Sequence, residues 1–273
     1  MNAKNLSSKK SIHSVGEPVI HPAAIVHPDA KLGHDVSIGP FTIIGPNVSI
    51  GPECQISSSV VIEGNTTIGR GNRIFSGAVI GTEPQDLKYN EEISFVKIGD
   101  NNVIREYVTI NLATTKNGVT KVGSNCLIMA YAHIAHECVV EDHVILANSV
   151  NLAGHVRIGE HAILGGMTPV HQFVRIGAHA FVGGGSRLSQ DVPPFFTVAG
   201  NPIGIAGVNS VGLKRREFSD QEVMNLKHAY KLLYRKELNV TQALDRVAVE
   251  CDLDIHIENL MAFIRRSERG IVR

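Results

Sequence analysis

The chain has 273 residues, and its 26 basic side chains balance its 26 acidic ones. This balance argues against a broad nucleic-acid-binding surface, and no apolar run approaches the roughly eighteen residues that indicate a transmembrane helix. The four cysteines form no CxxC pair, so neither disulfides nor a zinc ribbon is expected and a reducing compartment is the default.

Residues 1–16 are polar and carry no apolar segment of the kind that marks a signal peptide. We expect a disordered leader there. The ordered part of the chain is expected to begin at residue 17.

A six-residue repeat starts at Ile20. Every sixth residue from there to Ile80 is Ile, Val or Leu, and the pattern resumes in phase at residues 98, 104 and 110. It then continues without exception from Val122 to Leu188, usually with a small residue or Val four positions after each aliphatic one. Three of the cysteines occupy that small position, so we interpret them as packing residues.

A strict period of six fits neither an α-helix, whose period is 3.6, nor a flat strand, whose period is two. It is typical of a parallel β-helix. The pattern resembles the hexapeptide-repeat transferases, whose left-handed β-helix has three hexapeptides in each triangular coil. We therefore predict an all-β solenoid over 17–190, with about nine coils stacked ~4.8 Å apart.

Two segments interrupt the repeat. Residues 82–97 place Asp86 and Glu92 at aliphatic positions, and residues 112–121 place Lys116 at another. Charged side chains are unlike the core of such a coil, so both segments are expected to loop out of it. Loops on a rigid scaffold commonly carry binding groups.

The repeat stops at a proline-rich break after residue 190, and 191–273 are expected to form a connector and a helical domain. Ser219 with Glu222 and Asn239 with Gln242 are capping-box signatures for two helices. A third amphipathic helix is expected before Gly270. These helices are too short to fold alone and should pack on the end of the solenoid.

With three hexapeptides per coil, residues eighteen apart lie on adjacent coils. His136, Gly154 and Gln172 then stack at one edge, with His155 and His171 beside them. A neutral imidazole suits general-base work near pH 7, and a free backbone N–H such as that of Gly154 is suited to stabilise an oxyanion. The group predicts direct acyl transfer to a bound hydroxyl.

Two points remain open at this stage. Glu137 either orients the His136 imidazole or points to solvent. A zinc site is a second interpretation, because the γ-class carbonic anhydrases share this prism and bind zinc through three histidines. The candidates here are His133, His136 and His155. We expect no metal, since that family lacks the helical tail and the QDLKY segment. A non-catalytic scaffold is a third.

Specific motifs extend the comparison over essentially everything from Val19 onward. They are QDLKY (85–89), AHIAHEC (132–138), LAGHV (152–156), GGMTPVHQF (165–173), QDVPPF (190–195), GVNSVGLKRR (207–216) and the closing RGIVR. In this order they resemble the UDP-N-acetylglucosamine acyltransferases of lipid A biosynthesis.

The resemblance implies an activity, partners and a compartment. It implies transfer of an (R)-3-hydroxyacyl chain from acyl carrier protein to the 3-hydroxyl of UDP-N-acetylglucosamine, the first step of lipid A biosynthesis. It implies a cytoplasmic homotrimer in a Gram-negative-type bacterium, with active sites between subunits. No cofactor is implied beyond the phosphopantetheine of acyl carrier protein.

The resemblance also implies residue roles. By motif, His136 is the general base and the Gly154 amide is the oxyanion donor. The remaining matches are the residues lining the sugar and acyl subsites (Asp86, Lys88, His133, His155, His171 and Gln172), the nucleotide contacts (Asn209 and Arg215) and the positions that set acyl-chain length (Gly184 and Pro202).

The chain departs from the family pattern at Val211, where a glutamate is expected. A carboxylate able to accept hydrogen bonds from the nucleotide is therefore lost. Some relatives acylate a 3-amino sugar, so N-acylation by the same site stays open. The related glucosamine N-acyltransferase is disfavoured because it carries an additional N-terminal domain, which we do not expect in the leader.

Overall fold

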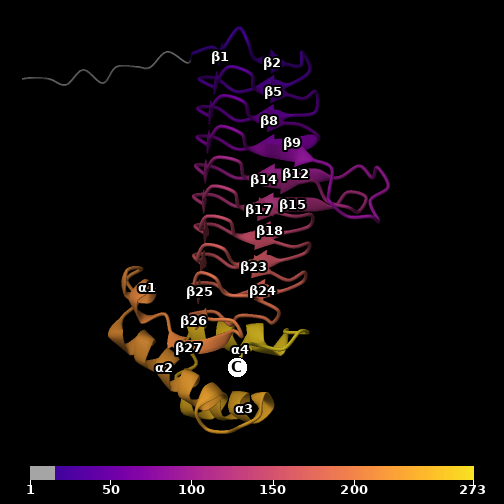
Figure 1. Cartoon of the computed structure of the whole chain (residues 1–273). Helices are drawn as coiled ribbons and strands as arrows, with labels where there is room; N and C mark the ends of the chain where they lie inside the picture. Colours follow the sequence, from indigo (N-terminus) through magenta and orange to yellow (C-terminus); the bar gives the residue numbers. More distant parts are fainter. Residues whose placement is uncertain (1–15) are drawn as a thin grey trace, which may run out of the picture.

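The computed structural model describes residues 16–273, so nearly all of the expected leader lies outside the described residues. The chain forms a left-handed parallel β-helix with a cluster of helices at its C-terminal end (Figure 1). Each coil is a three-sided turn of short strands, as the six-residue repeat predicted. The predicted fold class is confirmed by this arrangement.

Three sheets form the sides of the prism, with strands three elements apart paired in parallel along most of each sheet. The first sheet contains β1 Val19–Ile20, β4 Ser37–Ile38, β7 Gln55–Ile56, β10 Arg73–Ile74, β13 Val103–Ile104, β16 Leu127–Ile128, β19 Ile145–Leu146, β22 Ile163–Leu164, β25 Phe181–Val182, β26 Phe196–Ala199 and β27 Gly204–Val208. The second contains β2 Ile25–Val26, β5 Ile43–Ile44, β8 Val61–Ile62, β11 Val79–Thr82, β14 Thr109–Asn111, β17 His133–Ile134, β20 Asn151–Leu152 and β23 Pro169–Val170. The third contains β3 Lys31–Leu32, β6 Ser49–Ile50, β9 Asn65–Ile68, β12 Phe95–Ile98, β15 Val119–Val122, β18 Val139–Val140, β21 Arg157–Ile158 and β24 Arg175–Ile176.

The core is built from the aliphatic positions of the repeat. The second residue of a two-residue strand points inward, as Ile134 and Leu152 do, and successive coils place these residues in register. Each such buried side chain contributes on the order of 1.5–3 kcal/mol. Cys54, Cys126 and Cys138 are buried in the small positions, which agrees with the packing role expected for them.

The turns between sheets define three corners: the first joins the first and second sheets, the second joins the second and third, and the third joins the third back to the first. Many of these turns place a non-glycine residue at positive φ, for example Glu137 at 52° and His155 at 63°. The N–H of such a residue often donates to a carbonyl one coil earlier, as that of His155 does to His136 over 3.0 Å, whereas the N–H of Glu137 donates to the Thr120 hydroxyl over 3.0 Å. The corner residues therefore stack with a fixed spacing.

Both interruptions of the repeat leave the prism at the second corner, because each follows a strand of the second sheet and precedes one of the third. They are shorter than expected. Residues 95–98 form β12 and residues 119–122 form β15, so the excursions cover only 83–94 and 112–118. The longer one stands out from the side of the prism (Figure 1).

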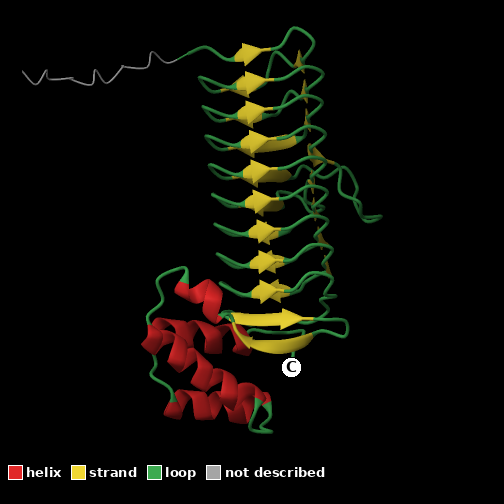
Figure 2. Ribbon diagram, turned by 60° about the vertical axis from the view of Figure 1, so that its left-hand side comes forward, coloured by secondary structure: helices red, strands yellow, loops and turns green. Residues whose placement is uncertain are grey.

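The first sheet does not stop at the proline-rich break near residue 190. β26 adds to β25 in parallel, and β27 pairs with β26 in antiparallel fashion. The segment expected to be a connector after residue 190 therefore contains two strands, the last of which ends at Val208. The β26–β27 hairpin closes the C-terminal end of the prism, and the helices pack against it (Figure 2).

Four helices follow: α1 Ser210–Lys214, α2 Asp220–Tyr234, α3 Val240–Glu250 and α4 Ile255–Arg265. The capping boxes of α2 and α3 are both present as predicted, and α1 is a short addition. The helices share a second core that includes Phe195 and Phe196 from the end of the coil. Among residues 16–273 no helix is long and apolar enough to span a bilayer.

Candidate active site

Three consecutive coils bring their turn residues together at the second corner. His136 and Glu137 lie between β17 and β18, and Gly154 and His155 lie between β20 and β21 one coil below. Both excursions also emerge at this corner, above these turns. The juxtaposition of loops and histidines therefore follows from the topology of the coil.

The imidazole of His136 lies against the backbone of Gly154. A Cβ added at Gly154 would come 2.2 Å from Cε1 and 2.4 Å from Nε2 of His136, so any side chain there would displace the imidazole. The stacking of residues 136 and 154 predicted from the eighteen-residue period is thus present.

The N–H of Gly154 is available to a ligand. The N–H of the following residue, His155, is taken by the carbonyl of His136, whereas the N–H of Gly154 has no hydrogen-bond acceptor within residues 16–273. At the third corner some corresponding N–H groups are occupied, as where the backbone N–H of Ser124 donates to Oδ1 of Asp142 over 2.7 Å. The second corner therefore leaves a donor open beside an imidazole.

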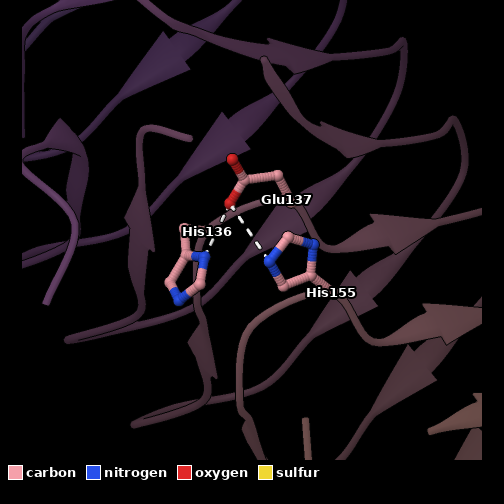
Figure 3. A group of neighbouring side chains, drawn as sticks. All are labelled: His136, Glu137 and His155. Atoms are coloured by element: carbon pink, nitrogen blue, oxygen red, sulfur yellow. Dashed lines mark hydrogen bonds and ion pairs between the residues drawn. The ribbon is translucent and has the colours of Figure 1, made fainter. Parts of the chain in front are cut away.

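Glu137 orients His136. Its Oε2 lies 2.6 Å from Nδ1 of His136 and 3.9 Å from Nε2 of His155 (Figure 3). With Nδ1 donating to the carboxylate, Nε2 of His136 carries the free lone pair, which is the arrangement a general base requires. The alternative that Glu137 points to solvent is excluded by this contact.

The 112–118 excursion closes over Glu137. Oε1 of Glu137 accepts hydrogen bonds from the backbone N–H groups of Thr114 (2.8 Å) and Thr115 (3.0 Å) and from both hydroxyls. Burial raises the pKa of the Glu137 carboxyl, but the hydrogen bonds from His136, Thr114 and Thr115 outweigh it and leave that pKa below its ordinary value. Glu137 is thus held as an anion beside His136.

Asp86 and Lys88 arrive from the longer excursion. Oδ2 of Asp86 lies 3.6 Å from Nε2 of His136, and Oδ1 of Asp86 accepts the N–H of Lys88 over 2.8 Å. These residues line a cleft of about 340 Å³ whose lining comprises Asp86, Lys88, Thr114, Thr115, His136, His155, Gln172 and Phe173. Nε2 of His136 therefore faces a space that can admit a substrate.

Two further histidines are held in their neutral form. Burial, followed by the proximity of His136, lowers the pKa of His133, whose Nδ1 lies 2.7 Å from the hydroxyl of Thr109. Burial also lowers the pKa of His155, whose ring stacks on Phe173 at 4.6 Å. His171 is exposed on the next coil, with Nδ1 3.1 Å from the Gln172 carbonyl.

Thr114, Thr115 and Phe173 complete the site but were not singled out from the sequence. The threonines lie in a segment recognised only as a loop, and their contact with Glu137 depends on how that loop closes. Phe173 is the last residue of the GGMTPVHQF motif, and its positive φ of 66° places it under His155. Phe173 lies eighteen residues after His155, so the coil period alone could have predicted that the two side chains stack.

The other predicted site residues lie elsewhere in this chain. The Asn209 side chain donates to the His179 carbonyl at the third corner, and Arg215 follows at the end of α1. Gly184 lies at the first corner beside Gly166, and Pro202 lies in the β26–β27 hairpin. One sheet of the prism separates each of those two corners from His136, so a single copy does not assemble the whole predicted set.

Within residues 16–273, two groups of side chains have the composition of a metal site. Ligand atoms of His136, Glu137 and His155 lie within 4.8 Å of one another, but His136 already shares a hydrogen bond with Glu137 that a metal would have to displace. His143 and His161, with Glu160, form the other group. Their rings stack at 4.5 Å and 17°, so their lone pairs lie in nearly parallel planes, which does not favour convergence on one ion.

The curated relatives and the model of the C-terminal segment point to one family. Residues 191–272 match the model described as UDP N-acetylglucosamine O-acyltransferase, domain 2, residues 120–154 match the bacterial transferase hexapeptide model, and residues 16–115 match a GMPPB C-terminal domain model. The acyl-[acyl-carrier-protein]–UDP-N-acetylglucosamine O-acyltransferases of Gloeothece citriformis and Thermodesulfovibrio yellowstonii are similar to the chain. The first is 52% identical over 208 residues, which are 76% of this chain and 75% of the relative. The second is 53% identical over 215 residues, or 78% and 83%.

Solved structures show the same likeness. The UDP-N-acetylglucosamine acyltransferase of Bacteroides fragilis superposes with a TM-score of 0.92 at 44% identity, covering 93% of this chain and 100% of the other. The UDP-N-acetylglucosamine O-acyltransferase of Moraxella catarrhalis gives 0.89 at 41% identity, covering 93% and 99%. The similarity therefore includes both the coil and the helical end.

Proposed function

The chain belongs to the UDP-N-acetylglucosamine O-acyltransferase family, and we propose that its second corner is the catalytic centre for that reaction. The enzyme transfers an (R)-3-hydroxyacyl chain from acyl carrier protein to the 3-hydroxyl of UDP-N-acetylglucosamine, the first step of lipid A biosynthesis. The observation that carries the assignment of the site is the contact of the His136 imidazole with Gly154.

His136 acts as the general base. Its Nε2 takes the proton of the sugar 3-hydroxyl as that oxygen attacks the thioester carbonyl. The Nδ1–H donates to Glu137, whose anionic carboxylate stabilises the imidazolium that forms. This division of roles needs no Ser or Cys nucleophile, and the described cleft lining contains neither.

Gly154 stabilises the intermediate. Attack converts the thioester carbonyl into an oxyanion, and the open N–H of Gly154 is placed to donate to it. Collapse of the intermediate then breaks the carbon–sulfur bond. The proton held by His136 passes to the departing thiolate of the phosphopantetheine arm, which restores the neutral base.

The remaining cleft residues hold the substrates. Asp86 and Lys88 are placed on the sugar side, next to Nε2 of His136. His133, His155, His171 and Gln172 follow the same edge over successive coils. Because burial keeps His133 and His155 neutral, they offer hydrogen bonds to hydroxyl and carbonyl groups without adding a charge beside the base.

The working form is a homotrimer with its clefts between subunits. Asn209 and Arg215 lie at the third corner, so a neighbouring copy supplies these nucleotide contacts to the second corner. The first sheet supports such packing, since the C-terminal part of its outer face, from β13 to β25, is an apolar column. The column consists of Val103, Leu127, Ile145, Ile163 and Phe181. Gly184, at the adjoining first corner, then faces the space where an acyl chain ends, and Pro202 follows in the hairpin.

No further cofactor is required by this chemistry, because the acyl group arrives as a thioester. The cytoplasm of a Gram-negative-type bacterium is the compartment in which acyl carrier protein supplies it. Val211 is exposed on α1 beside Asn209, where it adds no acceptor to the nucleotide contacts.

One assay tests the function directly. Purified protein is incubated with a panel of 3-hydroxyacyl carrier proteins and either UDP-N-acetylglucosamine or its 3-amino analogue. Transfer to the hydroxyl acceptor with one preferred chain length is expected. Preferential acylation of the amino analogue would replace the O-acyl assignment.

A further inference from the structure

Arg157 and Arg175 form an unusual pair on the outer face of the third sheet. They are direct partners on adjacent coils, in β21 and β24, and both precede an inward-pointing isoleucine. Like charges directly opposite each other destabilise a sheet. The pair therefore calls for a compensating anion.

The protein itself supplies little compensation. Arg175 donates to the Arg266 carbonyl over 2.9 Å and lies 5.0 Å above the Phe263 ring, both neutral partners. Arg269 similarly donates to the Ser189 carbonyl over 3.1 Å. Among residues 16–273, Arg157 makes no side-chain hydrogen bond, and none of these four arginines forms an ion pair.

Two carboxylates lie directly beside these arginines, whereas Glu141 and Glu160 line adjoining hollows with Arg175. Asp191 is buried, with Oδ1 accepting the Arg175 backbone N–H (2.8 Å) and Oδ2 accepting the Ser267 hydroxyl (2.7 Å), so it organises the backbone. Glu268 is exposed. Against the four arginines of this region, these two acids leave a positive excess, and the guanidinium groups of Arg175 and Arg269 are positioned by neutral partners.

The arginines line a groove that continues from the catalytic cleft. Its volume is about 410 Å³, and its lining comprises His155, Arg157, Phe173, Arg175, Asp191, Arg266, Glu268 and Arg269. His155 and Phe173 also line the catalytic cleft. An anion held by the groove would therefore lie next to the acyl-transfer site.

We propose that this groove docks the acyl carrier protein donor, with the phosphodiester of its prosthetic arm seated between Arg157 and Arg175. The assignment rests on the proposed acyl transfer. Guanidinium groups are well suited to phosphate oxygens, and an open basic surface fits an acidic protein. The diphosphate of the acceptor is assigned elsewhere, to the third-corner residues Asn209 and Arg215.

Arg157→Gln is the test variant, because the Arg157 side chain makes no hydrogen bond that folding would lose. Lys97→Gln is the matched control, since Lys97 is exposed on the same sheet in β12 and lies outside the groove. Steady-state rates are measured with three donors: acyl carrier protein, acyl-phosphopantetheine and acyl-pantetheine, which lacks the phosphate. Binding of fluorescent holo-acyl carrier protein is measured separately.

The expected result is a KM rise on the order of tenfold or more for both phosphorylated donors. KM for acyl-pantetheine and for UDP-N-acetylglucosamine stays unchanged, and the control matches the wild type. The assignment would be overturned if KM stayed unchanged for every donor or rose equally for all three. It would also be overturned if KM rose for the carrier protein alone or for UDP-N-acetylglucosamine. The binding measurement needs no turnover, so it separates the two proposals. If the acyl-transfer function is wrong, the wild type will bind the carrier protein without transferring an acyl chain.

Discussion

Nδ1 of His136 lies 2.6 Å from Oε2 of Glu137, the next residue in the chain. Two successive side chains can meet this way because Glu137 adopts a positive φ of 52° at the corner. Its other oxygen is held by the 112–118 excursion. The local backbone and a loop of the preceding coil thus act together to fix the tautomer of the base.

Replacing Glu137 with Gln should leave His136 in place but without its anionic partner at Nδ1. We expect kcat to fall at least about tenfold and KM for the carrier protein donor to stay the same. A rise in KM as large as the fall in kcat would indicate a merely structural role. A Glu137→Gln enzyme that keeps the wild-type kcat would show that the carboxylate does not assist the base.

The same carboxylate should influence stability at acid pH. Its pKa is lowered in the folded protein, so its contribution is complete above the ordinary pKa of a glutamate and is lost as the pH falls through the lower folded value. The free energy of unfolding, measured in urea between pH 3 and 6, should therefore be higher for the wild type than for Glu137→Gln. This difference should become smaller as the pH falls. A difference independent of pH would contradict the role of the threonine hydrogen bonds.

Gly154→Ala should disable the enzyme without unfolding it. The added Cβ would displace the imidazole of His136 from its seat, and we expect a loss in kcat of roughly 10²–10³. Gly204→Ala is the control, because nothing lies within 4 Å of its added Cβ. Activity assays with circular dichroism check both variants; an active Gly154→Ala enzyme would show that the contact is dispensable.

The cysteines of the coil should be unreactive in the folded protein. Burial raises the pKa of Cys138 to about 12 and that of Cys126 to about 11. Thiol titration at pH 8 should therefore label these residues only after denaturation. Rapid labelling of either one in the native state, located by mass spectrometry, would mean that the coil opens locally.

Much of the architecture was predictable because a period of six leaves few alternatives. Ile134 and Leu152 repeat an inward position, and the coil geometry then places Gly154 beside His136 without knowledge of any contact. The role of Glu137 was not predictable, because it depends on the φ of one turn residue and on the closure of a loop.

The ends of elements were also harder to predict. Residues 95–97 and 119–121 were expected in the excursions because the neighbouring polar residues mask where the strands resume. β26 was missed because the prolines before Phe196 indicate a break, although the chain re-enters the first sheet directly afterwards. Helix α1 is too short to show a helical period.

The central claim is that the His136 imidazole, seated against Gly154, is the base for acyl transfer. Its most direct test is kcat of His136→Ala with acyl carrier protein thioester and UDP-N-acetylglucosamine, beside His228→Ala as an exposed-histidine control on α2. The account predicts a loss of about 10²–10⁴ for His136→Ala, with fold and assembly intact and His228→Ala unaffected. A His136→Ala enzyme that keeps nearly full activity would contradict it.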